Sequence, residues 1–129
     1  MSVRIVRLGS PRAPREGTRI GTVRRPPRGV PKAQFSARDW YDVWFPILAP
    51  SLEIMKRAQQ ATTPAQWSSF ARTYRAEMAR PEAKHALRLL ATLSHTANFS
   101  VGCYCEDESH CHRSLLRKLL VENGARVES

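Results

Sequence analysis

The side chains best suited to chemistry gather in one short segment near the end of the chain. Residues 103–113 read CYCEDESHCHR and contain all three cysteines of the protein, two of its four histidines and an arginine. Thiolates are nucleophiles, imidazoles carry protons, both bind zinc or iron, and arginine holds phosphate through a planar pair of N–H donors. Three kinds of site therefore fit this segment: an anion pocket, a metal site and a thiol centre.

The anion pocket depends on a helix that we expect to begin within this segment. If Ser109 caps that helix, then His110, Cys111 and His112 occupy its first turn, where free backbone N–H groups and the helix dipole favour an anion. Arg113 adds a bidentate fork for phosphate, and the field of the helix lowers the pKa of Cys111. The candidate catalytic set is Cys111 as nucleophile, His112 as proton carrier and Arg113 as phosphate holder.

Metal binding and thiol chemistry would use the same cysteines differently. Cys103, Cys105 and Cys111, with His110 or His112 as the fourth ligand, supply donors that zinc and iron prefer, although Cys-x-Cys lacks the usual Cys-x2-Cys spacing. No cofactor is predicted outright, and zinc or iron is the alternative. In a thiol centre, Cys111 attacks and Cys105 resolves. A fourth interpretation assigns the cysteines to a strand and the histidines to the surface, and the residues alone leave all four open.

The net charge of +10 is concentrated at the start of the chain. Residues 1–38 hold ten basic residues and one acidic residue, which gives this segment a net charge of +9. Such an excess favours an anionic partner, namely a phosphate-bearing ligand, a nucleotide or a nucleic acid. A non-catalytic module that binds nucleic acid through this arginine-rich third is therefore the alternative function. We expect part of the charge to be solvated (Arg4, Arg7, Arg12, Arg15, Arg19) and part to reach the candidate site (Arg24, Arg25, Arg28).

Hydrophobic periodicity predicts a small α/β protein that positions these groups. Strands are predicted at residues 3–8, 19–24 and 98–104, and a short strand or an irregular apolar segment at residues 40–45. Helices are predicted at residues 52–60, from Pro64 after a capping box formed by Thr63 and Gln66, from Pro81, and at residues 110–123 before Gly124. We expect one domain over residues 1–129, with a short, mostly parallel sheet flanked by about four helices and with frayed ends at 1–2 and 126–129.

A parallel sheet would bring the arginines and the cysteine segment together. The carboxyl ends of parallel strands meet at one edge, where ligands of open α/β sheets bind. The second strand ends near Arg24, and the last strand ends at Cys103. The expected members of the resulting basic pocket are Arg28, His112 and Arg113, with Tyr74 and Arg75 as walls.

The composition also excludes some classes of protein. No run approaches the roughly 20 uncharged apolar residues that a membrane span needs. The start, MSVRIVR, has arginines where a secretory signal has its apolar core. We therefore expect a cytoplasmic protein without a membrane partner, in which a disulfide framework is not favoured.

Two blocks of residues resemble a known family. The pattern Cys-x-Cys-x5-Cys-His-Arg before a leucine-rich helix is similar to the signature of the family called domain of unknown function 488 (YeaO-like). The second block matches in three places: Arg28-Gly29-Val30, Leu48-Ala49-Pro50-Ser51, and Trp67, Phe70 and Tyr74-Arg75-Ala76-Glu77-Met78. The resemblance covers residues 3–125. It implies a compact α/β domain of the bacterial or archaeal cytosol, and it implies no defined activity.

Overall fold

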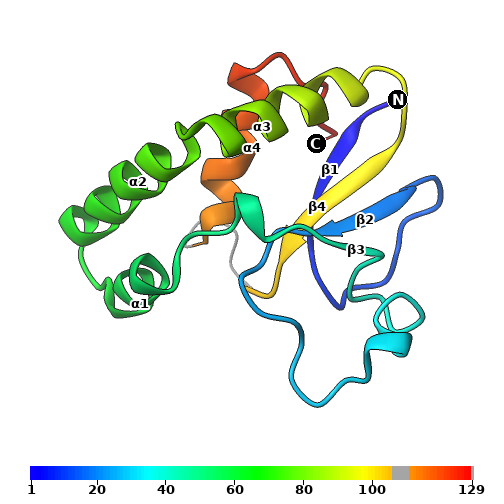
Figure 1. Cartoon of the computed structure of the whole chain (residues 1–129), viewed down its shortest axis with the longest axis horizontal. Coiled ribbons are helices and arrows are strands. Elements are labelled where there is room, and N and C mark those ends of the chain that lie inside the picture. Colours follow the sequence, from blue (N-terminus) through cyan, green and yellow to red (C-terminus); the bar gives the residue numbers. More distant parts are fainter. Residues whose placement is uncertain (106–110, 129) are drawn as a thin grey trace.

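The computed structural model, shown in Figure 1, describes residues 1–105 and 111–128. The strands are β1 (Val3–Arg7), β2 (Thr18–Gly21), β3 (Val43–Trp44) and β4 (Phe99–Cys103). The α-helices are α1 (Leu52–Gln60), α2 (Pro64–Met78), α3 (Pro81–Leu93) and α4 (His112–Glu122), and two 3-10 turns lie at Lys32–Gln34 and Pro46–Leu48. These elements confirm the predicted α/β class, with a four-stranded sheet and four α-helices.

All neighbouring strands of the sheet run parallel, in the order β1-β4-β2-β3. The central strand β4 pairs Val101 with Ile5 of β1 on one side and with Ile20 of β2 on the other. Strand β2 ends at Gly21, three residues earlier than predicted. Both the backbone N–H and the hydroxyl of Thr22 donate to the Gly102 carbonyl, and the chain then leaves the sheet towards a proline-rich segment. The carboxyl ends of β1, β2 and β4 therefore share one edge.

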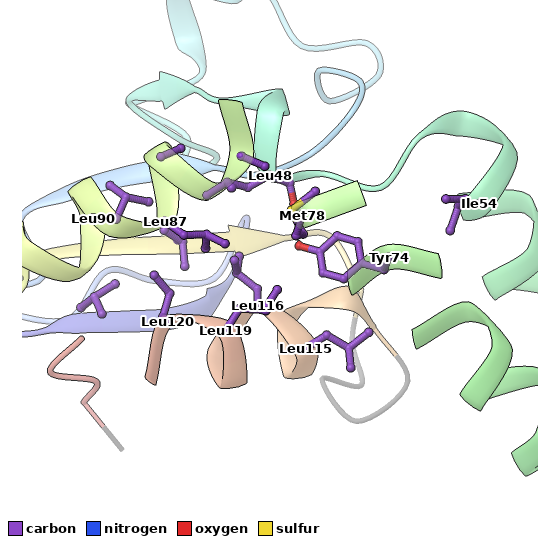
Figure 2. Close-up of a cluster of buried hydrophobic side chains, with 14 of the residues drawn as sticks. Leu48, Ile54, Tyr74, Met78, Leu87, Leu90, Leu115, Leu116, Leu119 and Leu120 are labelled. Carbon is purple, nitrogen blue, oxygen red and sulfur yellow. The ribbon is translucent and has the colours of Figure 1, made fainter. Parts of the chain in front are cut away.

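Side chains from the α-helices and from one face of the sheet form the main core (Figure 2), and α1 packs against α2, away from the strands (Figure 1). Helix α2 begins with the predicted capping box, in which Thr63 accepts from the backbone of Gln66 and the Gln66 side chain accepts from the backbone of Thr63. Alternate residues of β4 point to opposite faces, so Phe99 and Val101 enter this core. The labelled side chains in Figure 2 come from several helices and meet between them (Tyr74, Met78, Leu87, Leu90, Leu115, Leu116, Leu119, Leu120).

A buried ion pair lies on the opposite face of the sheet and fixes the loops that pack there. Arg19 is fully buried, and its guanidinium donates to both carboxylate oxygens of Glu16 at 2.7 and 3.0 Å. The same guanidinium donates to the carbonyls of Ser10 and Asp39 at 2.8 and 2.7 Å. Ser100 of β4 completes the cluster by donating to Glu16. Arg19 therefore clamps two loops onto the sheet, and the expectation that it is solvated is wrong.

Two of the other arginines that we expected to be solvated also pair with acids. Arg12 donates to both oxygens of Asp42 at 2.8 and 2.9 Å and to Asp39 at 3.2 Å. The Arg4 guanidinium lies 3.9 Å from Glu128. The positive charge of residues 1–38 is thus partly balanced by acidic residues that the fold brings close, and the net charge of the segment does not show this.

The two ends of the chain lie side by side (Figure 1). Val3 donates to the Arg126 carbonyl at 2.9 Å, and Glu128 donates to the Val3 carbonyl at 2.8 Å. Ser2 donates to Asn98 and to Glu128. Residues 2 and 126–128, which we expected to be frayed, thus extend the sheet edge instead. No helix in the described part of the chain has the length and apolar composition that a membrane span requires.

Candidate functional site

A cavity of about 830 Å³ opens at the carboxyl edge of the sheet. Its walls are the segments that follow β1, β2 and β4, together with the start of α4, and side chains of the β3 approach and of α1 and α2 complete it. The segments are residues 7–11, 23–28, 103–105 and 111–112. The structure therefore brings Arg24, Arg25 and Arg28 to the cavity that the cysteine segment lines.

Helix α4 begins later than predicted. Its capping position is Cys111, whose side chain makes no capping hydrogen bond, and His112 and Arg113 are its first two residues. The predicted start at His110 and the predicted cap Ser109 lie outside the described residues. The first turn of α4 thus places His112 next to the thiols, because Cys111 and His112 adjoin at the helix start.

His112 is buried, and its hydrogen bonds define its tautomer. Nε2 lies 2.9 Å from the carbonyl oxygen of Thr22, and because a carbonyl only accepts, Nε2 carries the proton. In the neutral ring, Nδ1 is then the acceptor, and it lies 3.7 Å from Sγ of Cys111. Burial lowers the pKa of His112 to about 4, so the ring is neutral at pH 7. His112 consequently presents a lone pair to the cysteines.

Two of the three thiols form a close, buried pair. Sγ of Cys103 and Sγ of Cys111, both buried, lie 2.6 Å apart, and Cys105 is exposed. Hydrogen bonds from Cys103 and Cys111 lower the pKa of Cys105, with help from the charge of Arg113. The hydrogen bond to Cys105 raises the pKa of Cys103.

For Cys111, the hydrogen bond with Cys103 lowers the pKa, but the hydrogen bond to Cys105 and burial outweigh it and raise the pKa. The pKa of Cys111 is therefore shifted in the direction opposite to the one expected from the helix field.

Arg113 contacts the backbone of Cys105 and does not line the cavity. Its side chain is 4% exposed, it is not among the residues that line the cavity, and one terminal nitrogen donates to the carbonyl of Cys105. Its Nε has no hydrogen-bond partner among the residues that the structure describes. The structure thus does not bring Arg113 together with Arg28 in the cavity, and the Arg113 guanidinium instead lies against the backbone of Cys105.

The arginines after β2 differ in what holds them. Arg24 donates to the carbonyls of Ala49 and Pro50, which anchors it to the wall of the cavity. Arg25 and Arg28 are exposed, and within residues 1–105 and 111–128 neither guanidinium has an acidic partner. These two arginines remain available to an anion.

Aromatic side chains complete the cavity, and sequence reasoning did not select them. Trp40 and Tyr104 line it with ring centroids 5.8 Å apart in an edge-to-face arrangement. The Tyr104 hydroxyl donates to the Arg25 carbonyl at 2.8 Å, which ties the arginine segment to β4. Tyr104 lies between two cysteines, so its position signals the site. Nothing in the sequence connects Trp40 with residues some 60 positions later.

The expected walls Tyr74 and Arg75 lie elsewhere. Tyr74 is fully buried, its hydroxyl donates to the Leu48 carbonyl at 2.7 Å, and its ring centroid lies 5.7 Å from that of His112. Arg75 pairs with Glu122 on the surface at 2.8 Å. Tyr74 therefore packs against the His112 imidazole without lining the cavity, and Arg75 takes no part in the site.

Comparisons with known proteins place this chain in one family. A family model described as the active DUF488-N3 subclade matches residues 3–124. Comparisons with curated proteins and with solved structures found no match. The matched range includes both segments that build the cavity, the arginines after β2 and the cysteines after β4.

Proposed function

The chain belongs to the DUF488 family, and we propose that it binds a nucleotide in the cavity at the carboxyl edge of the sheet. The observation that carries this proposal is the pair of exposed guanidinium groups of Arg25 and Arg28 on the cavity wall, without an acidic partner in the described residues. Guanidinium groups hold phosphate oxygens through paired N–H donors. The phosphate of the ligand therefore lies against the segment that follows β2.

The size and the aromatic wall of the cavity favour a ligand that also carries a base. A volume of about 830 Å³ exceeds the needs of inorganic phosphate and suits a nucleotide. Trp40 and Tyr104 offer ring faces and edges to a planar base, as in nucleic-acid-binding proteins where bases stack on aromatic side chains. Cys105 and His112 line the same cavity, so the bound ligand contacts groups capable of nucleophilic attack and proton transfer.

Binding measurements with matched charge variants test the proposal. Isothermal titration with nucleoside mono-, di- and triphosphates should show binding to the wild-type protein. The double variant Arg25→Gln/Arg28→Gln should lose at least about a hundredfold in affinity, since each charge-assisted contact contributes about 1.5 to 3 kcal/mol. The control Lys32→Gln/Arg38→Gln removes the same charge at exposed positions that do not line the cavity, and it should bind like the wild type. Equal losses in both variants would contradict the proposal.

Salt dependence separates a free nucleotide from a nucleic-acid strand. A module that tracks a nucleic-acid backbone loses affinity steeply as salt rises, because each neutralised phosphate releases counterions. Single-stranded oligonucleotides titrated at several salt concentrations measure that slope. A cavity that binds one nucleotide should show a shallow slope and no gain in affinity with strand length. A steep slope shared by the variant Arg24→Gln/Arg25→Gln/Arg28→Gln and its parent would instead assign binding to other basic residues.

A further inference from the structure

Metal-ligating atoms gather on the side of the cavity formed by the end of β4 and the start of α4, apart from the arginines that we propose hold the phosphate. Sγ of Cys103, Sγ of Cys111 and a ring nitrogen of His112 all lie within 4.8 Å of one another, and all three residues are buried. Cys105, two residues after Cys103, is exposed and lines the same cavity. Two sulfur atoms and one imidazole nitrogen thus lie together, and the sulfur of Cys105 would complete a Cys3His ligand set, which is typical of zinc.

The imidazole is oriented as a metal ligand requires. The Thr22 carbonyl accepts from Nε2 at 2.9 Å and thereby directs the lone pair of Nδ1 towards the thiols. Histidines that bind metals generally donate their second ring nitrogen to a carbonyl or carboxylate in this way. The ring of Tyr74 packs beside the imidazole and restricts its rotation. His112 therefore reaches the cluster with its geometry already set by the fold.

The distances between the three buried donors agree with tetrahedral coordination after a small adjustment. Zn–S bonds of about 2.3 Å and Zn–N bonds of about 2.0 Å place neighbouring sulfur and nitrogen ligands about 3.6 Å apart. The separation between Cys111 Sγ and His112 Nδ1 is 3.7 Å. Cys103 Sγ and Cys111 Sγ, at 2.6 Å, must separate by about 1 Å to reach the sulfur–sulfur spacing of such a site. Rotation of the two cysteine side chains supplies that movement.

A disulfide between Cys103 and Cys111 is the competing explanation of their short contact, and it accounts for less of the site. It would use two of the four donor atoms and would leave the buried Nδ1 of His112 facing a group with no proton to give. It would also leave Cys105 as an unpaired exposed thiol. A bound cation uses all four donors at once.

We propose that Cys103, Cys105, Cys111 and His112 bind a zinc ion on this side of the cavity. The histidine is His112, not His110, because the fold directs its Nδ1 to the thiols. Cys105 is the exposed ligand and completes the set by turning its side chain towards the three buried donors. All four residues line the cavity, so a molecule bound there lies next to the metal. The site stands on its own donor atoms and holds whether or not the cavity takes a nucleotide.

Cobalt substitution tests the proposal on the reduced, full-length protein. Titration with Co²⁺ under anaerobic conditions should give thiolate-to-cobalt charge-transfer bands and the intense visible bands of a tetrahedral site, saturating at one equivalent. Zn²⁺ should then displace the cobalt. Cys103→Ser and Cys111→Ser should each weaken zinc binding by at least about a hundredfold, more than the loss of a supporting group causes. His85→Gln, at an exposed position on α3, is the matched control and should bind zinc like the wild type.

X-ray absorption on the wild-type protein with zinc keeps the proposal testable if a cysteine variant fails to fold. The expected first shell is three sulfur atoms at about 2.3 Å and one nitrogen at about 2.0 Å. A shell of oxygen and nitrogen alone would overturn the proposal. So would reduced protein that binds no Co²⁺ and returns in air to a Cys103–Cys111 disulfide identified by peptide mass spectrometry.

Discussion

Replacing Glu16 with glutamine should destabilise the protein far more than its loop position suggests. The carboxylate is 3% exposed and accepts from Arg19 twice, from Ser100 and from the backbone of Ala13. Glutamine keeps the shape but removes the negative charge and replaces one acceptor oxygen with an NH2 donor, which leaves the charge of the buried Arg19 guanidinium without a counter-ion. Breaking a buried pair in this way costs about 3 to 5 kcal/mol. That is a large fraction of the 5 to 15 kcal/mol by which domains are stable.

Urea denaturation followed by tryptophan fluorescence and circular dichroism measures this loss. The matched control is Glu122→Gln, which breaks the exposed Arg75–Glu122 pair and should leave the unfolding midpoint unchanged. The clamp also positions the loops that carry the carbonyls of Ser10 and Asp39, next to cavity residues Gly9 and Trp40. Glu16→Gln should therefore weaken ligand binding as well as stability.

The pH dependence of the same variant gives a second check. Burial raises the pKa of Glu16, but the hydrogen bonds from Arg19 and Ser100 outweigh burial and lower it below the usual value. The stabilisation is thus present above the pKa of the unfolded chain and is lost as the pH falls through the folded pKa. The difference between wild type and Glu16→Gln should shrink in acid. A loss below about 1 kcal/mol at pH 7, or one equal to that of Glu122→Gln, would refute the clamp.

Three further predictions concern the fold. Burial raises the pKa of Asp42, but hydrogen bonds from Arg12 and from the Arg19 backbone outweigh burial and lower it to about 2. Asp42→Asn should therefore cost about 1 to 2 kcal/mol of stability at pH 7 and progressively less between pH 4 and 2, as unfolding measured at each pH will show. Gly17→Ala should cost more than about 2 kcal/mol of stability because φ is +77° and the new Cβ would clash with the carbonyl oxygen of Asn98. Gly124→Ala, where φ is +89° but no atom lies near the new Cβ, should cost about 1 kcal/mol in the same unfolding assay. Thr63→Ala should cost about 1 kcal/mol by removing the capping box, which thermal unfolding will detect; no change would mean that Pro64 alone starts the helix.

Local patterns predicted most elements of this fold. The capping box at Thr63 and the start of α3 at Pro81 fall where expected, because these signals act within a few residues. The parallel sheet was predicted from strands alternating with helices, although only β3 and β4 are separated by α-helices, and its carboxyl edge brings Arg28 to the cavity of the cysteine segment. Short-range rules thus predicted which segments meet.

The features that the sequence did not reveal depend on contacts between distant residues. Arg19 resembled its solvated neighbours, and only the approach of Ser10 and Asp39 makes it a buried clamp. A shared pocket was predicted for Arg113 and Arg28 because both are basic and near one sheet edge, yet the Arg113 side chain donates to the backbone of Cys105 and does not line the cavity. The tautomer of His112 depends on Thr22, 90 residues earlier, which no local pattern encodes.

A crystal structure of the protein with a nucleoside monophosphate tests the central claim most directly. The phosphate should lie within hydrogen-bond distance, about 3 Å, of the guanidinium groups of Arg25 and Arg28, with the base against Trp40 or Tyr104. A nucleotide bound away from the carboxyl edge of the sheet, or a cavity that stays empty at saturating nucleotide, would contradict the account.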